Sequence, residues 1–153
     1  MCGICGELQF QDGPARDEAT IAHLSALMAQ RGPDDAGRWH DGHHAWLAFR
    51  RLAILDLSPT GHQPMLTPDG RYALVFNGEV YNFRQLRDEL ERVGVPFRSS
   101  GDTEVVLQAL AHWGTAALDR LNGMFALALY DRRERSLLLA RDHAGIKPLY
   151  YLV

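Results

Sequence analysis

The segment Met124-Phe125-Ala126-Leu127-Ala128-Leu129-Tyr130-Asp131 is followed by the charged tip Arg132-Arg133-Glu134-Arg135 and then, after Ser136, by Leu137-Leu138-Leu139-Ala140-Arg141. The first and last parts are mostly apolar and of strand length. Two such runs joined by a short polar turn are typical of a β-hairpin. We therefore predict antiparallel strands over 124–131 and 137–141.

The rest of the chain divides into short strands and adjacent helices. Apolar or alternating segments predict strands over 2–10, 45–55, 72–76 and 149–153. Apolar residues at helical spacing predict helices over 17–30, 82–93, 102–113 and 117–121. Segments rich in Gly and Pro predict loops over 31–37 and 58–68. Asn82 and Asp102 are the expected helix N-caps. This order favours an α+β fold of helices on largely antiparallel sheets over a doubly wound parallel sheet.

The composition is that of an ordinary globular chain, with 153 residues, 46% hydrophobic residues and a formal net charge of −3. The longest apolar run, Met124 to Tyr130, is far shorter than the roughly 20 residues of a membrane-spanning helix. The charge does not favour nucleic acid as a partner, no glycine-rich phosphate loop is present, and the histidines lack metal-binding spacing. We expect a cytosolic protein with no cofactor or metal in this chain, no nucleic acid and no membrane.

Cys2 is the strongest candidate for a catalytic residue. If Met1 is removed, the Cys2 thiol lies beside a free α-amino group, so one residue supplies a nucleophile and a base. Two alternatives stay open at this point. Cys2 could be a small apolar residue that opens a buried strand, or Cys2-Gly3-Ile4-Cys5 could be a redox pair or half of a metal site.

Asn77-Gly78-Glu79 follows an apolar strand segment. Asn-Gly is a common hairpin turn, and we predict that the strand over 72–76 ends in a turn at Asn77-Gly78. The same pair also offers a side-chain amide and an unhindered backbone N–H, which are the two donors of an oxyanion hole. The polar residues continue past this point, which weakens the case for a simple hairpin turn.

Arg51 and Asp102 are candidates for holding a charged ligand. Arg51 lies between apolar segments, where its guanidinium could bind a substrate carboxylate or pair with a carboxylate of the protein. Asp102 could bind a substrate ammonium if its helix faces a cavity, and otherwise serves as a helix cap.

Taken together, these residues resemble the glutaminase domain of class II glutamine amidotransferases, the N-terminal-nucleophile type, and among them the asparagine synthetase (glutamine-hydrolysing) family. The matching stretches occur in the family's order and cover nearly the whole chain: Met1-Cys2-Gly3-Ile4, Arg31-Gly32-Pro33-Asp34, Arg50-Arg51-Leu52-Ala53-Ile54-Leu55-Asp56, Asn77-Gly78-Glu79-Val80-Tyr81-Asn82, Ser100-Gly101-Asp102-Thr103-Glu104, Leu121-Asn122-Gly123-Met124-Phe125-Ala126 and Arg141-Asp142-His143-Ala144-Gly145-Ile146-Lys147-Pro148-Leu149-Tyr150.

The resemblance implies a four-layer α/β/β/α sandwich of two antiparallel sheets and a role for each candidate. Cys2 would attack the side-chain amide of L-glutamine, with its own α-amine as the base. Asn77 and Gly78 would form the oxyanion hole. Arg51 would hold the substrate carboxylate, and Glu79 and Asp102 its ammonium group.

The resemblance also implies a partner. In this family the ammonia passes to a C-terminal synthetase domain that uses ATP and Mg²⁺, and that domain is absent from residues 1–153. We expect an incomplete glutaminase domain that ends within the strand predicted over 149–153, with a homodimer as a further possibility. The alternative from another class is a catalytically silent fragment or assembly module that at most binds glutamine.

Overall fold

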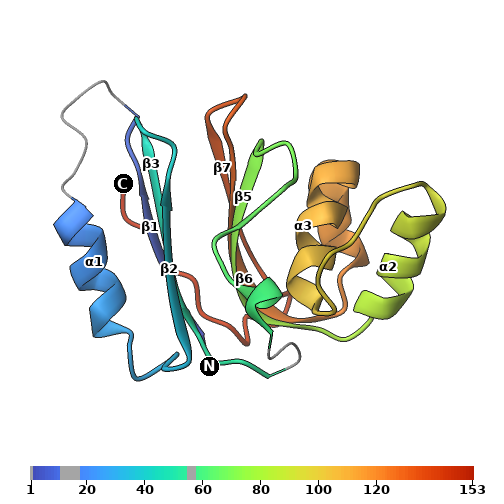
Figure 1. Ribbon diagram of the computed structural model, residues 1–153, viewed down its shortest axis with the longest axis horizontal. Coiled ribbons are helices and arrows are strands. Elements are labelled where there is room, and N and C mark those ends of the chain that lie inside the picture. Colours follow the sequence, from blue (N-terminus) through green and yellow to red (C-terminus); the bar gives the residue numbers. More distant parts are fainter. Residues whose placement is uncertain (1, 11–17, 55–57) are drawn as a thin grey trace.

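Two antiparallel sheets lie face to face, and each has helices on its outer side (Figure 1). The computed structural model describes residues 2–10, 18–54 and 58–153. From one side to the other, the layers are helix α1 (Glu18–Leu27), a three-stranded sheet, a four-stranded sheet, and then helices α3 (Asp102–Trp113) and α2 (Phe83–Arg92). The predicted α+β fold, a four-layer α/β/β/α sandwich, is confirmed.

All neighbouring strands are antiparallel. The three-stranded sheet has the order β1 (Gly3–Leu8), β3 (Ala45–Arg51) and β2 (Asp35–His40), and the four-stranded sheet the order β4 (Met65–Leu66), β5 (Tyr72–Val80), β6 (Gly123–Asp131) and β7 (Ser136–Arg141). Short 3₁₀ helices lie at Pro59–Gly61 (η1) and Gly114–Arg120 (η2). The predicted hairpin is the pair β6–β7. No helix in the described ranges is long and apolar enough to cross a membrane.

The two-residue period of the strands divides the core into two clusters. Side chains on one face of β3, β5 and β6 fill the space between the sheets, namely Ala45, Leu47, Phe49, Ala73, Val75, Ala128 and Tyr130. The alternate residues of β5 and β6, such as Leu74, Phe76 and Leu127, pack instead against α3 and α2. Because β5 and β6 are buried on both faces over most of their length, residues 72–76 and 124–130 are continuous apolar runs.

Several predicted elements differ from the structure. The loop predicted over 58–68 contains η1 and β4, α1 ends at Leu27, and β3 ends at Arg51. The loop predicted over 31–37 ends early, because Asp35–Gly37 already pair with β3 as the start of β2. β5 does not turn at Asn77-Gly78 but continues to Val80, since β6 supplies partners along its whole length. Residues 149–153 form no strand and are exposed from Tyr150 onward. Parts of two predicted elements, at Asp17 and Leu55, lie outside the described residues.

The two expected N-cap side chains bind elsewhere. Asn82 does precede α2, but its Nδ2 donates to the carbonyl of Arg120 and its Oδ1 accepts from the N–H of Asn122. Asp102 is the first residue of α3, after Gly101, and its carboxylate accepts from the N–H of Val80 on β5. Both side chains therefore join a helix to a neighbouring segment, and the Asp102 carboxylate also accepts from backbone N–H groups of the first turn of α3.

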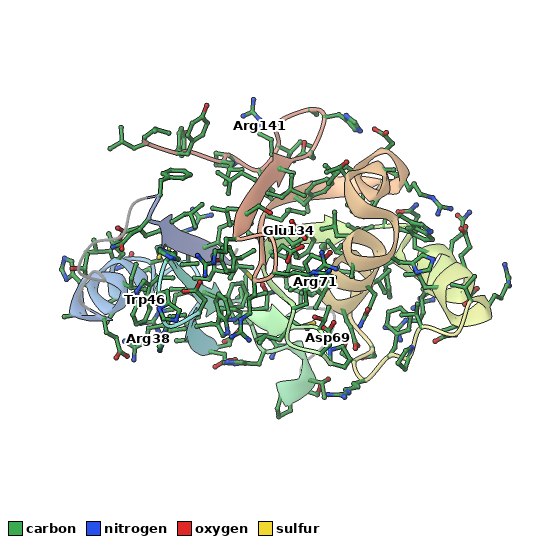
Figure 2. All side chains as sticks on the ribbon, turned by 90° about the horizontal axis from the view of Figure 1, so that it is seen from above. Arg38, Trp46, Asp69, Arg71, Glu134 and Arg141 are labelled. Atoms are coloured by element: carbon green, nitrogen blue, oxygen red, sulfur yellow. The ribbon has the colours of Figure 1, made fainter. Side chains whose placement is uncertain are left out.

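A polar contact joins the two sheets at the end of the sandwich where Asp41 links β2 to β3. The Tyr130 hydroxyl of β6 donates to Oδ2 of Asp41 at 2.7 Å. Burial first, and then this hydrogen bond, raise the pKa of Tyr130 to about 12. Nearby, Arg71 donates to both carboxylate oxygens of Asp131 and lies 4.0 Å from Glu134 (Figure 2).

Tyr130→Phe should lower the free energy of unfolding by about 1.5–3 kcal/mol at neutral pH, because it removes a hydrogen bond to a charged group and leaves the ring in place. Chemical denaturation measures this change. Tyr81→Phe is the matched control, since Tyr81 is 59% exposed, and should be neutral. Equal losses in the two variants would contradict the cross-sheet role of Tyr130.

Candidate functional site

A cleft opens at the end of the inter-sheet space opposite Asp41. Its volume is about 130 Å³, below the ~300–1,000 Å³ of pockets for drug-sized ligands, so it suits a molecule of amino-acid size. All six site residues predicted from the sequence line this cleft, namely Cys2, Arg51, Asn77, Gly78, Glu79 and Asp102. The fold therefore brings together residues from β3, β5, α3 and the segment that precedes β1.

The three-stranded sheet contributes Cys2 and Arg51. β1 pairs with β3 so that Gly3 lies opposite Arg50, and the same register places Cys2 opposite Arg51. The Cys2 thiol donates to the carbonyl of Leu52 at 3.6 Å and accepts from its N–H at 3.4 Å. Both side chains continue the inter-sheet face of their strands, which is apolar further along at Phe49.

The four-stranded sheet contributes Asn77 and Glu79. They have the same parity on β5 as Ala73 and Val75, which face the space between the sheets. Their side chains therefore point toward the sheet that carries Cys2. The inter-sheet face of β5 changes from apolar to polar at Asn77, and the cleft lies where this change occurs.

The outer edge of β5 carries a backbone N–H, that of Gly78, at a residue that lines the cleft. Just beyond the strand, the N–H of Tyr81 donates to the carbonyl of Asn122, which lies in the segment preceding β6. The backbone groups of an antiparallel strand alternate between its two edges. The odd-numbered residues of β5 therefore direct their N–H and C=O groups toward β6. The even-numbered residues direct theirs to the opposite edge. There the N–H of Phe76 binds the Gln63 side chain and the N–H of Val80 binds Asp102. The N–H of Gly78 lies between these two side chains.

Gly78 is glycine because two backbones approach closely. A Cβ added at Gly78 would lie 2.2 Å from the carbonyl oxygen of Met124 and 2.6 Å from Cα of Phe125, both on β6. This contact, rather than a turn, requires the residue without a side chain.

The carboxylate of Asp102 has a perturbed environment. Burial raises its pKa, the N–H donated by Val80 acts in the opposite direction, and the charge of Glu79 raises it further, so that the net shift is upward. The cleft therefore holds two carboxylates, and the charge of Glu79 disfavours the ionised form of Asp102. Arg51 lies at the other side of the cleft and donates from Nη1 to the carbonyl of Ser58 at 2.8 Å.

The interpretation of Cys2-Gly3-Ile4-Cys5 as a redox pair is wrong. Cys2 packs with Ile4 in the inter-sheet cluster, and Cys5 has the opposite parity on the strand, so the two thiols point to opposite faces. No group of three or more His, Cys, Asp or Glu residues that could hold a metal ion is found in the described ranges.

The cleft is also lined by residues that the sequence did not single out for the site, among them the buried polar residues Gln63 and Lys147. Gln63 is 3% exposed and Lys147 is 6% exposed. The loop that carries Lys147 is organised by Asp142, whose carboxylate accepts the N–H groups of Phe125, Ile146 and Lys147. The sequence signal for Lys147 is its place in the matching stretch 141–150, whose Gly145 has a positive φ of 65° in the turn before it.

Comparison with known proteins identifies relatives along the whole chain. Residues 1–153 match the family described as "Glutamine amidotransferase domain". A candidate asparagine synthetase [glutamine-hydrolyzing] of Mycobacterium bovis is 46% identical over 98% of this chain and 25% of its own length. Asparagine synthetase [glutamine-hydrolyzing] 1 of Bacillus subtilis is 41% identical over 99% of this chain and 24% of its own length. The chain thus spans about a quarter of the length of these curated relatives.

A solved structure shares the fold. Glutamine phosphoribosylpyrophosphate amidotransferase from B. subtilis, complexed with ADP and GMP, superposes with a TM-score of 0.68 over 91% of this chain and 37% of that chain. The sequence identity is 20%, so this similarity concerns the arrangement of the sheets and helices alone.

Gly78→Ala should lower the free energy of unfolding by about 1–3 kcal/mol, because the new Cβ forces β5 and β6 apart. Chemical denaturation of the purified variant measures the loss. Val93→Ala serves as the control, since Val93 is 59% exposed at the end of α2. Wild-type stability in Gly78→Ala would show that the strands are not in close contact there.

Proposed function

This chain belongs to the glutamine amidotransferase domain family, and from that premise we propose that it hydrolyses the side-chain amide of L-glutamine through a cysteinyl thioester, giving glutamate and ammonia. The observation that carries this proposal is the composition of one cleft. A cysteine near the chain start and an arginine face an Asn-Gly pair and two carboxylates across the space between the sheets.

The charges of the cleft suit a zwitterionic amino acid. Arg51 would bind the α-carboxylate of glutamine bidentately. Glu79 and Asp102 would bind the α-ammonium, which relieves the repulsion between the two carboxylates when the substrate enters. Bound in this way, the side-chain amide would extend toward Cys2.

Cys2 is the proposed nucleophile. Its sulfur would attack the amide carbon, and the C–N bond of the amide would break to release ammonia. The α-amine of Cys2 would accept the thiol proton and deliver it to the leaving nitrogen, so Met1 must be removed for the reaction to proceed. Water would then hydrolyse the glutamyl thioester to glutamate and restore the thiol.

Asn77 and Gly78 would stabilise the charge that develops on the substrate oxygen. The side-chain amide of Asn77 points into the inter-sheet space, and the Gly78 N–H points to the outer edge of β5. Donors held in place before the reaction favour the tetrahedral intermediate over the ground state.

The ammonia would be used by a synthetase domain of the longer protein. The asparagine synthetase relatives, of which this chain matches about a quarter, support this partner. We propose that such a domain forms an amide bond with ATP and Mg²⁺, and that residues 1–153 supply its ammonia as a glutaminase domain.

Cys2→Ala should abolish glutamate release from glutamine in the full-length, Met1-free protein while leaving the circular dichroism spectrum unchanged. Cys5→Ser is the matched control and should keep most of the activity, because Cys5 faces away from the cleft. Activity in Cys2→Ala equal to that of the wild type would overturn the nucleophile. A wild-type protein that binds glutamine without hydrolysing it would support a binding or assembly module instead.

Asp102→Asn separates the binding role of Asp102 from its structural role, since Asn keeps an oxygen acceptor for the Val80 N–H. We expect glutamine affinity, measured by calorimetry in the Cys2→Ala background, to fall by roughly ten- to a hundred-fold. Stability at pH 7 should not fall, because the raised pKa of Asp102 means that its ionised form is disfavoured in the folded state.

The same shift predicts a pH dependence. As the pH falls through the raised pKa of Asp102, the carboxyl group takes up a proton and glutamine binding by the Cys2→Ala protein should weaken. Asp102→Asn should lose this part of the pH dependence. Unchanged affinity in Asp102→Asn would show that Asp102 serves only to hold Val80.

A further inference from the structure

The segment Ser58–Pro64 connects the two sheets beside the cleft. The Ser58 carbonyl accepts a hydrogen bond from Arg51, and His62 Nδ1 lies 2.7 Å from Oδ2 of Asp35 on β2. The other end of the segment leads into β4, which pairs with β5. This segment therefore contacts both halves of the candidate site.

Gln63 holds the outer edge of β5 with its side chain. β4 pairs Met65 with Leu74, and the same register would bring residue 63 opposite Phe76. β4 nevertheless begins at Met65, and its backbone pairing with β5 goes no further toward residue 63. Instead, Oε1 of Gln63 accepts the Phe76 N–H at 2.6 Å and its Nε2 donates to the Phe76 carbonyl at 3.2 Å.

This contact lies immediately before the proposed oxyanion donors. Phe76 precedes Asn77, and its N–H points to the same edge of β5 as that of Gly78. Gln63 is 3% exposed, so these two hydrogen bonds are shielded from water, as is a third that Nε2 donates to Oγ1 of Thr103 at 3.4 Å. Loss of these bonds would free the strand edge one residue before Asn77.

Gly61 lies against the Arg51 side chain, which belongs to the half of the site on the three-stranded sheet. A Cβ at Gly61 would lie 2.2 Å from Nη2 and 2.9 Å from Cζ of Arg51. The φ of Gly61 is not positive, so the backbone accepts Ala, and the guanidinium is the group that must move. Glycine at this position therefore sets how closely the Arg51 side chain lies against the segment.

We propose that Gln63 and Gly61 are positioning residues for amide hydrolysis: Gln63 aims the Asn77 and Gly78 donors, and Gly61 places the Arg51 guanidinium. This inference rests on the proposed glutaminase function. Through the two donors, Gln63 affects the stabilisation of negative charge that develops on the substrate oxygen during the reaction. Through Arg51, Gly61 affects the binding of glutamine in its ground state. The two residues should therefore affect different kinetic constants.

The test compares Gln63→Met and Gly61→Ala in the full-length, Met1-free protein. Gln63→Met should lower kcat by roughly 10–100-fold with little change in KM, which is less than the roughly 10²–10³-fold expected from loss of one donor in Asn77→Ala. Gly61→Ala should raise KM several-fold with little change in kcat. Its weaker glutamine binding should also appear by calorimetry in the Cys2→Ala background.

Gln108→Met is the matched control for the loss of a buried glutamine, since Gln108 is 8% exposed in α3 and lies outside the cleft. It should change stability without changing kcat. Non-additive effects of Gln63→Met and Asn77→Ala are expected if Gln63 acts through the donors. Unchanged kcat in folded Gln63→Met, or equal effects of Gly61→Ala on kcat and KM, would overturn the corresponding assignment.

A direct measurement covers the case in which Gln63→Met does not fold. In the wild-type protein, the Phe76 amide should exchange its hydrogen as slowly as the amides of β5 that bind β6, although no strand pairs with it. Rapid exchange would overturn the role of Gln63. Absence of glutaminase activity in the wild type would instead count against the proposed function, so the two failures are distinguishable.

Discussion

The outer edge of β5 is the constraint on which the cleft depends. β6 binds one edge of β5 along its whole length, whereas β4 binds the other edge only at Ala73 and Leu74. Beyond this point, side chains replace a neighbouring strand: Gln63 binds Phe76 and Asp102 binds Val80. A longer β4 would have satisfied the Gly78 N–H within the sheet and removed it from the cleft.

The second requirement is a change of polarity along strands that otherwise build a core. The inter-sheet faces of β3 and β5 are apolar over most of their length and end in Arg51, Asn77 and Glu79. Charged groups at the end of a low-dielectric space interact strongly with each other and with a ligand. This arrangement raises the pKa of Asp102, because burial and the charge of Glu79 both oppose its ionisation. The positive charge of a ligand ammonium would favour the ionised form of Asp102. A substrate can therefore gain binding free energy from Asp102 and Glu79, although these two carboxylates contribute little to the stability of the empty protein.

Part of this arrangement could be predicted from local patterns. The hairpin of β6 and β7 and the helices α2 and α3 follow from periodicities of apolar residues, whereas the stacking of two sheets was implied by the family resemblance alone. β2 was not predicted as a strand, because Gly37 and the preceding Pro33 suggest a loop. Its pairing with β3 is set by tertiary contact, since a side chain on Gly37 would meet the carbonyl of Gln63 at 1.8 Å. The strand predicted over 149–153 has the apolar residues of a strand but no neighbouring strand to pair with in the described structure.

The sequence by itself determined which residue types are available for chemistry: Cys2 near the chain start, the Asn77-Gly78 pair, and the charges of Arg51, Glu79 and Asp102. It also determined that Arg51 and Asn77-Gly78-Glu79 follow apolar strand segments, because a two-residue period is a local property. Only the tertiary structure decided that Asn77-Gly78 is straight strand rather than turn, since that depends on the close approach of Met124 and Phe125. Likewise, the partner of the Asp102 carboxylate and the part taken by Gln63 depend on which segments meet at the edge of β5. Such hydrogen bonds join residues 13 and 22 positions apart, so no local pattern in the chain encodes them.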